Sequence, residues 1–458
     1  MIFNSFNFLI LFPLLFILYY LIPAKYLKTR NLFLLVVSYA LYVNWMPAFA
    51  LVLLGVTAVT YWGGRIFGSE LRDLPEESVR LGGAESYELT AQRKKRLVWL
   101  FGVLGLLPLL VFKYYNFLNE SISDVLAAVG LQFALPGLNW AVPVGISFFT
   151  FQAVGYMLDV YYGRIKAESN FLDYALFISF FPSILSGPIN KASLVLPQIK
   201  SLRTYFDYGK AVEGLKMILW GMFMKVVVAD RVGLYVDTVL PSYMNYTGVT
   251  CFAASIFYTI QIYADFAGYS LMAIGVGKVL GFELTENFRR PYFAVSVTEF
   301  WHRWHISLST WLKDYVYIPL GGSRCSKLRN YWNIFVTFLV SGIWHGANWT
   351  FIVWGCMHGV CQIIEKTLGL NKKQSDSGWV KAVRILVTFL IVNFAWLFFR
   401  MPTLSDACGV IVRIFDFRLP MTLYVTALPT PPLMLIGCAL LFFKDFRDEF
   451  FSGKFQLT

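Results

Sequence analysis

The chain has 458 residues, of which 57% are hydrophobic and only 14% are charged, and its mean hydropathy is +0.59. Soluble domains carry about 25% charged residues, so this composition excludes an ordinary soluble enzyme and predicts an all-α polytopic membrane protein. The net charge of +12 does not indicate nucleic-acid binding, because the basic residues concentrate in alternate loops between apolar stretches.

Eleven apolar stretches are predicted to cross the bilayer, which takes about 20 residues in a helix. They lie near residues 5–22, 31–46, 48–64, 97–116, 139–161, 211–238, 250–279, 331–348, 350–366, 385–400 and 431–443. We expect the first stretch to be a retained helix rather than a cleaved signal peptide. It has no basic residues before it and no Ala-x-Ala cleavage site after it.

Two segments depart from the pattern of simple crossings. Residues 171–190 are apolar but contain Pro182 and the run Ser186-Gly-Pro188, which predicts a re-entrant or broken helix. Such backbone is tolerated at membrane depth only where protein or water surrounds it. Residues 299–320 are too polar to span the membrane, and the distribution of basic residues predicts that they lie on the cytoplasmic side.

The lysines and arginines predict the orientation of the chain. Of the 39 Lys and Arg residues, 30 lie in one of the two alternating sets of loops and two lie in the other. The basic set comprises 23–30, 65–96, 162–210, 280–330, 367–384 and the tail after 443. The other set comprises 45–48, 117–138, 239–249, 349 and 401–430. Basic loops face the cytoplasm and contact lipid headgroups, which predicts a cytoplasmic C-terminus and an N-terminus outside.

Residues 299–315 predict one amphipathic helix lying in the headgroup zone, with an aromatic face as its anchor. At 100° per residue this face contains Trp301, Trp304, Leu308, Trp311 and Tyr315. A second face contains Arg303, Ser307, Thr310 and Asp314, and a third contains His302, His305, Ser309 and Lys313. A metal site is not indicated, because the two histidines are followed by no third ligand at a recognisable spacing.

All four histidines of the chain lie between His302 and His358, and His345 lies inside the apolar run 334–349. A titratable side chain at membrane depth is costly and therefore usually functional. Imidazole has an ordinary pKa near 6.5, and burial favours its neutral, proton-accepting form. We therefore expect His345 to be a base, with His305 as a second polar group facing it.

Six segments of the chain form a pattern that is typical of a known family. They are residues 147–156, 180–189, 265–270, 287–292, 300–315 and 343–349. By these segments and their order, the chain from about residue 140 to 365 resembles the membrane-bound O-acyltransferase (MBOAT) family, and within it the bacterial alginate O-acetylation branch.

This resemblance implies a ring of helices around a tunnel that joins the two membrane faces. It implies that His345 is the catalytic histidine and that His305 is a second functional residue. The implied donor is a cytoplasmic thioester, acetyl-CoA or another acyl thioester, and no bound cofactor is expected. The implied partner is an extracytoplasmic hydrolase-like (SGNH/GDSL-type) acetyltransferase, so the polysaccharide is reached indirectly. A bacterial plasma membrane is the implied location.

Six further residues of these segments are candidates for substrate binding or for the tunnel lining: Asn348, Trp344, Asp314, Ser307, Asp265 and Asn287. Asn348 is a candidate oxyanion donor, with structural hydrogen bonding as the default alternative. Asp265 is either paired within the helical bundle or exposed to the tunnel.

We expect a single integral domain over 1–458, with N-terminal helices in 1–140, the catalytic core in 140–365 and C-terminal helices in 366–458. The predicted activity is O-acetylation of an extracytoplasmic, alginate-like polysaccharide. Another exopolysaccharide, peptidoglycan O-acetylation and D-alanylation of teichoic acid are alternatives with the same chemistry. A transporter or flippase is the alternative of another class. It is disfavoured because the chain has no internal repeat and because its histidines cluster in one region.

Overall fold

The computed structural model describes residues 3, 6–70, 84–131, 135–201, 206–371, 377–417, 423 and 431–451. For residues 69, 70, 84–91 and 431 it describes the backbone alone. Every regular element in this described part is a helix, which confirms the predicted all-α fold. Several predictions lie partly outside the described residues: the first span at residue 5, the loops 65–96, 117–138, 162–210, 367–384 and 401–430, and the tail after 443.

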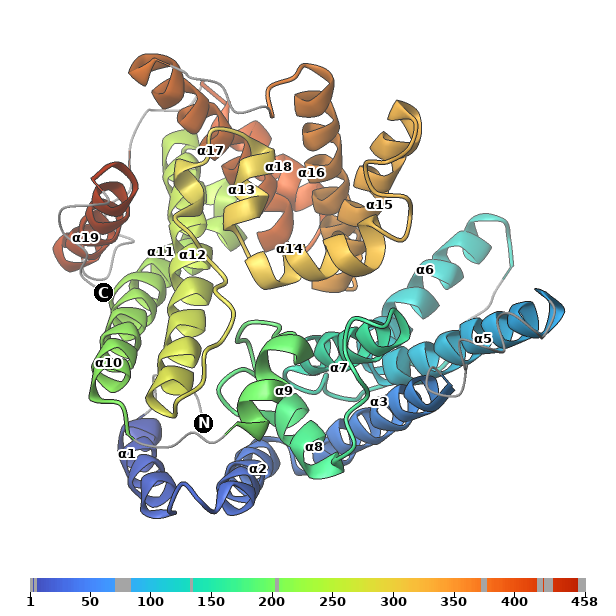
Figure 1. Ribbon diagram of the computed structural model, residues 1–458. Coiled ribbons are helices and arrows are strands. Elements are labelled where there is room, and N and C mark those ends of the chain that lie inside the picture. Colours follow the sequence, from blue (N-terminus) through green and yellow to red (C-terminus); the bar gives the residue numbers. More distant parts are fainter. Residues whose placement is uncertain are drawn as a thin grey trace. The chain divides into compact units, whose positions relative to one another are not determined.

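The chain forms two compact units (Figure 1). The first comprises Met1–Val212 and Val276–Thr285, and the second comprises Glu213–Gly275 and Glu286–Thr458. The predicted single domain, with divisions near residues 140 and 365, stays a prediction.

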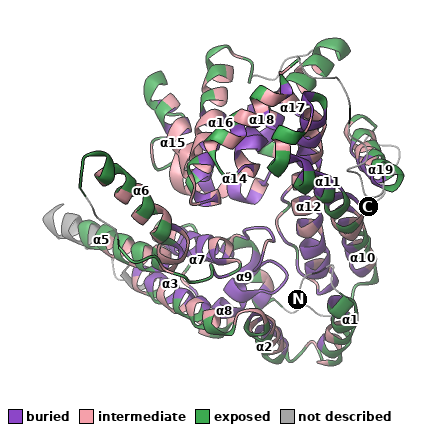
Figure 2. Cartoon of the chain, turned by 180° about the vertical axis from the view of Figure 1, so that it is seen from behind, coloured by how far each residue is buried: buried purple, intermediate pink, exposed green. Residues whose placement is uncertain are grey.

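The first unit is built from helices that follow the predicted apolar stretches. They are α1 (Phe6–Leu21), α2 (Leu27–Trp45), α3 (Ala50–Glu70), α5 (Ala84–Leu109), α6 (Tyr115–Ala128), α7 (Ile146–Tyr161), α8 (Phe171–Ser179) and α9 (Ala192–Lys200). A short 3-10 turn precedes α3, and a π-helical turn joins α5 to α6. Helices α3, α5 and α7 pack on one another. Figure 2 shows α7 as largely buried, whereas α6 has no buried residue.

Tyrosines connect α3, α7 and α8 inside this unit. The Tyr156 and Tyr174 rings lie 4.5 Å apart, and the Tyr174 hydroxyl is 2.8 Å from Thr60 Oγ1. The Tyr156 hydroxyl accepts a hydrogen bond from the backbone N–H of Glu168. Gly64 permits this packing, since a Cβ there would lie 2.7 Å from the Tyr156 ring. The hydroxyl groups of Tyr156, Tyr174 and Thr60 thus have hydrogen-bond partners, which lowers the cost of burying them.

The broken segment predicted at 171–190 is confirmed. Helix α8 ends at Ser179, and the following residues form a buried turn that contains Pro182. The backbone N–H of Phe181 donates to Ser38 Oγ, and Gln152 Nε2 donates to the carbonyl of Phe177. Side chains of α2 and α7 therefore satisfy backbone groups that the broken helix leaves open.

The second unit holds the residues of the candidate site. Its helices are α10 (Tyr208–Met222, which begins in the first unit), α11 (Asp230–Val239), α12 (Gly248–Val279, which ends in the first unit), α13 (Val297–Arg303), α14 (Ile306–Leu312), α15 (Lys327–His345), α16 (Trp349–Thr367), α17 (Gly378–Arg400), α18 (Leu404–Ile414) and α19 (Pro431–Phe450). π-Helical turns follow α10 and α14.

Pairs of glycines let helices of this unit cross closely. Gly221 of α10 faces Gly268 of α12, where a Cβ on Gly268 would lie 2.7 Å from the Gly221 carbonyl oxygen. Gly355 of α16 faces Gly342 of α15 in the same manner, with 3.0 Å between an added Cβ and the Gly342 Cα. Small residues at helix crossings are typical of membrane proteins. In lipid no hydrophobic driving force holds helices together, so they associate through the van der Waals contacts that close backbone approach allows.

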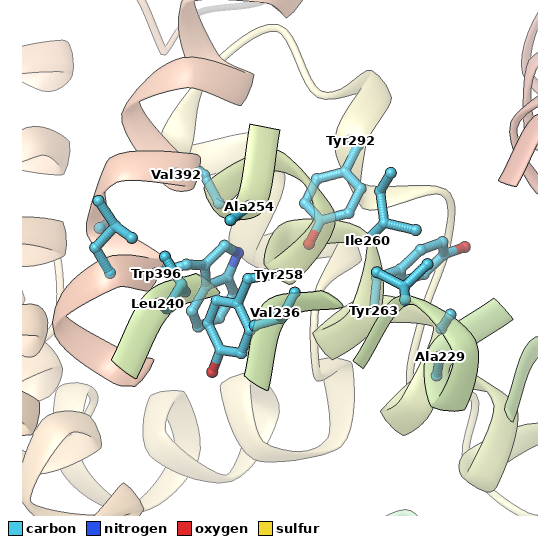
Figure 3. Packing of buried hydrophobic residues seen from close by; sticks show 14 of the residues in the cluster. Ala229, Val236, Leu240, Ala254, Tyr258, Ile260, Tyr263, Tyr292, Val392 and Trp396 are labelled. Atoms are coloured by element: carbon cyan, nitrogen blue, oxygen red, sulfur yellow. The ribbon is translucent and has the colours of Figure 1, made fainter. Parts of the chain in front are cut away.

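The core of the second unit lies among α11, α12 and α17 (Figure 3). Trp396 of α17 is 1% exposed and Val236 of α11 is fully buried. The Tyr292 hydroxyl donates to the carbonyl oxygen of Thr259 at 2.6 Å. Trp301 and Trp304 of the predicted headgroup anchor also belong to this core.

Four helical stretches of the described residues are long and apolar enough to cross a membrane. They are Pro47–Gly68, Gln92–Ala128, Gly248–Val279 and Gly378–Arg400. Many large apolar side chains on them face outward. In Gln92–Ala128, only 17% of the 18-residue apolar stretch is buried inside the protein. Contiguous apolar surface of this kind requires lipid rather than water. The number of eleven spans stays a prediction.

Some predicted boundaries differ from the observed ones. The span predicted at 139–161 begins as a helix only at Ile146, and the helix predicted to end at 116 continues to Ala128. Helices α9 and α18 occupy segments predicted as loops. These two helices are short, 9 and 11 residues, so they lack the long apolar run by which spans are recognised.

The continuous helix predicted for 299–315 is wrong. Helix α13 ends at Arg303, His305 adopts a left-handed backbone conformation, and α14 starts at Ile306. Trp301 and Trp304 are 4% and 2% exposed, so they pack inside the protein instead of anchoring a surface helix. The helical spacing of these tryptophans was compatible with one amphipathic helix, but their burial places this segment in the core.

Candidate functional site

Helices α15 and α16 position His345. The two helices form a tightly packed hairpin, and His345 is the last residue of α15. Gly346 follows it, at a point where a Cβ would overlap the Phe351 ring. Asn348 then starts α16, because its Oδ1 accepts the backbone N–H of Thr350 at 3.0 Å. His345 therefore stands at a sharp reversal that a side chain at Gly346 would disrupt.

The hydrogen bond of His345 fixes its tautomer. Nδ1 lies 2.7 Å from the carbonyl oxygen of Ser341. A carbonyl oxygen can only accept, so Nδ1 must donate its proton. In the neutral ring Nε2 then carries the lone pair and is the atom able to accept a proton.

Aromatic rings surround His345. The centroids of Trp344, Trp354 and Phe399 lie 4.9, 4.8 and 5.4 Å from its ring centroid. Their interplanar angles of 89°, 71° and 74° are edge-to-face arrangements. His345 itself is half-buried. Such walls hold the imidazole in one orientation and lower the local dielectric, while the remaining exposure leaves access to its edge.

His305 lies at the break between α13 and α14. Its backbone has φ 44° and ψ 53°, and its side chain is 1% exposed. A non-glycine residue in this region costs about 1–3 kcal/mol and persists only where its surroundings impose it. Histidine tolerates this conformation better than most residues do. The sequence spacing gave no indication of this turn.

The structure brings His305 and His345 to the same aromatic side chain. Trp344 lies 5.9 Å from the His305 ring and 4.9 Å from the His345 ring, and Phe266 of α12 lies 4.7 Å from His305. Burial holds the pKa of His305 well below its ordinary value, and a positive charge on His345 would lower that pKa further. His305 is therefore a neutral group beside the candidate base.

The segment that follows α12 supports the His305 turn. Asn287 is fully buried, and its Oδ1 accepts hydrogen bonds from the backbone N–H and the hydroxyl of Ser307 at 3.3 and 2.7 Å. Its Nδ2 lies 3.1 Å from Ser270 Oγ, and its carbonyl oxygen accepts the N–H of Ile306 at 2.9 Å. Two of the predicted tunnel residues, Asn287 and Ser307, are thus bonded to each other.

Hydrogen bonds to a carboxylate secure the start of α13, and an ion pair secures its end. At its start, the Glu365 carboxylate accepts the backbone N–H groups of Val297 and Thr298 at 2.5 and 2.9 Å. At its end, Arg303 donates to both carboxylate oxygens of Glu449 at 3.0 Å. Glu449 lies in α19 and also pairs with Arg290 at 3.0 Å. Helices α16 and α19 therefore fix the helix that precedes His305.

The other predicted site residues lie in different surroundings. Asn348 caps α16, and its Nδ2 donates to the carbonyl of Pro402, so both ends of its amide make structural hydrogen bonds. Asp265 forms an ion pair with Lys225, which also pairs with Asp230 at 2.7 Å. Asp314 is half-buried in the π-helical turn after α14. Roles of Asn348, Asp265 and Asp314 in catalysis or in a tunnel stay predictions.

His358, for which no role was predicted from the sequence, lies close to the same site. It is 1% exposed, and its Nδ1 accepts a hydrogen bond from Trp301 Nε1 at 3.2 Å. The Trp354 ring contacts both His358 and His345, at 4.9 and 4.8 Å. The clustering of all four histidines in the sequence was the signal by which His358 could have been predicted as a site residue.

A cavity of about 260 Å³ lies next to the site. Its lining includes Trp301 and Ser341, and also the basic side chains of His302, Lys313 and Lys366. Ser341 is fully buried, and its Oγ has no hydrogen-bond partner among the described residues. Since the carbonyl of Ser341 holds His345, the cavity extends to the residue that fixes the candidate base.

Comparison with known proteins identifies the family. The sequence profile of the membrane-bound O-acyltransferase family matches residues 161–402. The chain is also 39% identical over 421 residues to a probable alginate O-acetylase, AlgI, of Pseudomonas aeruginosa, covering 91% of this chain and 75% of that protein. The chain belongs to the membrane-bound O-acyltransferase family.

Two other membrane-bound acyltransferases are similar to this chain. A peptidoglycan O-acetyltransferase of Helicobacter pylori is 35% identical over 343 residues, which cover 69% of this chain and 64% of that protein. A teichoic acid D-alanyltransferase of Bacillus subtilis is 27% identical over 309 residues, which cover 65% of this chain and 76% of that protein.

The predicted resemblance is confirmed, and the chain is a multi-pass membrane O-acyltransferase. The family match contains all four histidines and the α15–α16 hairpin. The family membership and the relatives also decide against the transporter alternative.

Proposed function

We propose that this membrane-bound O-acyltransferase moves an acetyl group from a cytoplasmic thioester to an acceptor outside the membrane, for O-acetylation of an alginate-like polysaccharide. The observation that carries the proposal is the hydrogen bond that His345 Nδ1 donates to the Ser341 carbonyl oxygen. Its Nε2 is therefore the proton-accepting atom. The 39% identity to a probable alginate O-acetylase supports the choice of polymer.

The proposed reaction needs one base. The acceptor hydroxyl transfers its proton to His345 Nε2 while its oxygen attacks the carbonyl carbon of the thioester. The carbon–sulfur bond then breaks, and the leaving thiolate takes the proton back from His345. An ester and a free thiol are released, and the ring is neutral again. His305, whose ring also contacts Trp344, orients the acceptor, stabilises charge or relays the proton.

The cavity of about 260 Å³ supports a place for the donor. Acetyl-CoA and carrier-bound acyl thioesters both carry phosphate groups, which lysine side chains attract. Lys313 and Lys366 line this cavity, and so does Ser341, whose carbonyl oxygen holds His345. The positive-inside distribution of charge predicts that Lys313 faces the cytoplasm, where such donors occur.

The proposed setting is a bacterial plasma membrane, with the N-terminus outside and the C-terminus in the cytoplasm. An extracytoplasmic SGNH/GDSL-type transferase would accept the acetyl group on a side chain or a small carrier and pass it to the polymer. The peptidoglycan and teichoic acid relatives support the two alternative polymers.

Substitution of His345 tests the proposal. His345→Ala should abolish ester-linked acetate on the cell-surface polymer while membrane abundance stays near the wild-type level. His345→Asn is the matched variant, because its amide retains a donor for the Ser341 carbonyl but provides no base. Acetate released by mild alkali from purified polymer measures the outcome. Acetylation that persists in either variant would contradict the base assignment.

The same preparation separates the candidate polymers. We expect ester-linked acetate in the alginate-like exopolysaccharide fraction, and its loss in His345→Ala. Acetate in the peptidoglycan fraction, or D-alanine esters in a teichoic acid fraction, would overturn the proposed substrate. Either result would leave the proposed chemistry at His345 standing.

A further inference from the structure

The turn that carries His305 is bonded on one side to the chain segment 287–289. The N–H of Ile306 donates to the Asn287 carbonyl, and the N–H of Arg289 donates to the Arg303 carbonyl, both at 2.9 Å. These two backbone hydrogen bonds flank His305, one on each side. The left-handed residue therefore lies between two points at which another segment holds the backbone.

The side chain of Asn287 adds a second layer of hydrogen bonds. Its Oδ1 receives the N–H and the hydroxyl of Ser307 at 3.3 and 2.7 Å, and its Nδ2 lies 3.1 Å from Ser270 Oγ. Asn287 is 0%, Ser270 2% and Ser307 4% exposed. Because water cannot reach these groups, removal of the amide would leave their hydrogen bonds unmade.

Ser270 connects the hydrogen bonds of Asn287 to helix α12. The same helix supplies Phe266, whose ring lies 4.7 Å from the His305 imidazole. The ring of His305 is thus fixed against α12 on one face, while its backbone is fixed to α12 through Asn287 and Ser270. Both the conformation and the position of the imidazole are determined from one helix.

We propose that Asn287 is a positioning residue for His305. It holds the left-handed turn so that the imidazole stays against Phe266 and Trp344, and it acts on acyl transfer through His305 without touching the substrate. This inference rests on the proposed function of His305, and it replaces the expectation that Asn287 binds substrate or lines a tunnel.

Steady-state kinetics of the purified enzyme in detergent, with acetyl-CoA as donor, tests the proposal. Asn287→Ala should lower kcat by about 10- to 100-fold, the usual consequence of displacing a catalytic group by an ångström or less. The KM for the donor should change less than about threefold, because no substrate contact is lost. Asn287→Asp retains an acceptor for Ser307 and should recover much of kcat. A rise in KM with an unchanged kcat would overturn the proposal.

A double-mutant cycle with His305→Gly identifies the residue through which Asn287 acts. Glycine accepts the left-handed backbone without strain and removes the imidazole. In the His305→Gly background, Asn287→Ala should change kcat less than about threefold. Full additivity of the two losses would show that Asn287 acts elsewhere and would overturn the proposal.

Asn393→Ala is the matched control. Asn393 is also fully buried, and its amide bonds to Ser255 and Thr259 on the same helix α12. Its removal should lower thermal stability to a similar extent as Asn287→Ala while kcat stays within about threefold of wild type. An equal loss of kcat in both variants would show that general destabilisation explains the effect of Asn287→Ala, and it would overturn the proposal.

Hydrogen–deuterium exchange separates this proposal from the proposed function. Asn287→Ala should accelerate exchange at the N–H groups of Ile306 and Ser307, whether or not the enzyme turns over in the assay. Accelerated exchange with full activity would overturn the positioning role and leave the acyl transfer intact. A wild-type enzyme that transfers no acetyl group would overturn the proposed function. The exchange result would still show whether Asn287 holds the turn at His305.

Discussion

At the scale of single residues, the site depends on one hydrogen bond. Ser341 presents a carbonyl oxygen to His345 Nδ1, so the lone pair of the neutral ring is at Nε2. The sequence predicted His345 from its place in an apolar run and His305 as a second polar group facing it, and the family resemblance implied a function for both. It could not predict the tautomer, because the tautomer depends on a rotamer that Trp344, Trp354 and Phe399 together select.

The buried His305 predicts a pH dependence of stability. Its pKa lies well below the ordinary value in the folded protein, whereas the unfolded chain binds a proton near pH 6.5. Below about pH 6.5 the unfolded state therefore holds more protons, and the free energy of unfolding should fall by about 1 kcal/mol per pH unit. We expect the apparent melting temperature in detergent to fall between pH 7.5 and pH 5.5.

The His305→Asn variant isolates that contribution, because asparagine tolerates the left-handed backbone but does not titrate. Its melting temperature should fall less than that of wild type over the same pH range. His302→Gln, which alters an exposed histidine, should keep the wild-type difference. An identical pH dependence in wild type and His305→Asn would contradict the prediction.

The lysines of the 260 Å³ cavity predict an effect on donor binding. Lys313→Gln and Lys366→Gln should each raise the KM for acetyl-CoA by about fivefold, equivalent to about 1 kcal/mol for a partly solvated ion pair. The kcat should stay close to wild type, since neither ammonium group contacts the reacting carbon. Lys327→Gln, an exposed lysine at the start of α15, is the control. An unchanged KM in both cavity variants would place the donor elsewhere.

At the scale of secondary-structure elements, the long helices follow directly from the apolar runs. The sequence placed α12 at 250–279 and α15 at 331–348, and the structure has Gly248–Val279 and Lys327–His345. The break at His305 could not be predicted in this way. The tryptophan spacing fits a continuous helix, and the turn is imposed by hydrogen bonds from Asn287, which is distant in the sequence. The role of Asn287 was hidden for the same reason.

The close crossing of α15 and α16 predicts that adding one methyl group at Gly355 lowers the stability of the protein. Gly355→Ala should lower stability by about 1–3 kcal/mol, because the new Cβ would lie 2.5 Å from the Phe338 carbonyl oxygen and force the helices apart. Thermal unfolding in detergent measures the loss.

Gly55→Ala on α3 is the matched control for this crossing. No atom of the described residues lies within 4 Å of a Cβ at Gly55, so alanine should leave stability unchanged or raise it by about 0.5–1 kcal/mol. A Gly355→Ala protein as stable as wild type would show that the crossing has room for a side chain.

At the scale of the whole molecule, the distribution of basic residues predicts which loops face the cytoplasm. The chain itself provides two reporters, because Cys325 and Cys408 are both exposed. Cys325 lies in the basic loop set and Cys408 in the other set. We therefore expect a membrane-impermeant maleimide to label Cys408 in intact spheroplasts, and Cys325 only after the membrane is permeabilised.

Two single substitutions assign the labelled positions. Cys408→Ser should remove the label gained by intact spheroplasts, and Cys325→Ser should remove the label that permeabilisation adds. Labelling of Cys325 in intact spheroplasts, with Cys408 protected, would invert the predicted topology. The proposed cytoplasmic donor would then have to reach the enzyme from the other face.

Glu449 has a consequence for biosynthesis. Its carboxylate pairs with Arg303, beside the His305 turn, and with Arg290, the other non-glycine residue with a positive φ among those described. The ribosome adds Glu449 long after it has added both histidines. A nascent chain stalled before α19 therefore contains every proposed reacting group but lacks Glu449, one of the two carboxylates that pair with Arg303 at the end of α13. We therefore expect the end of α13 to be fully secured only after this last described helix has been synthesised.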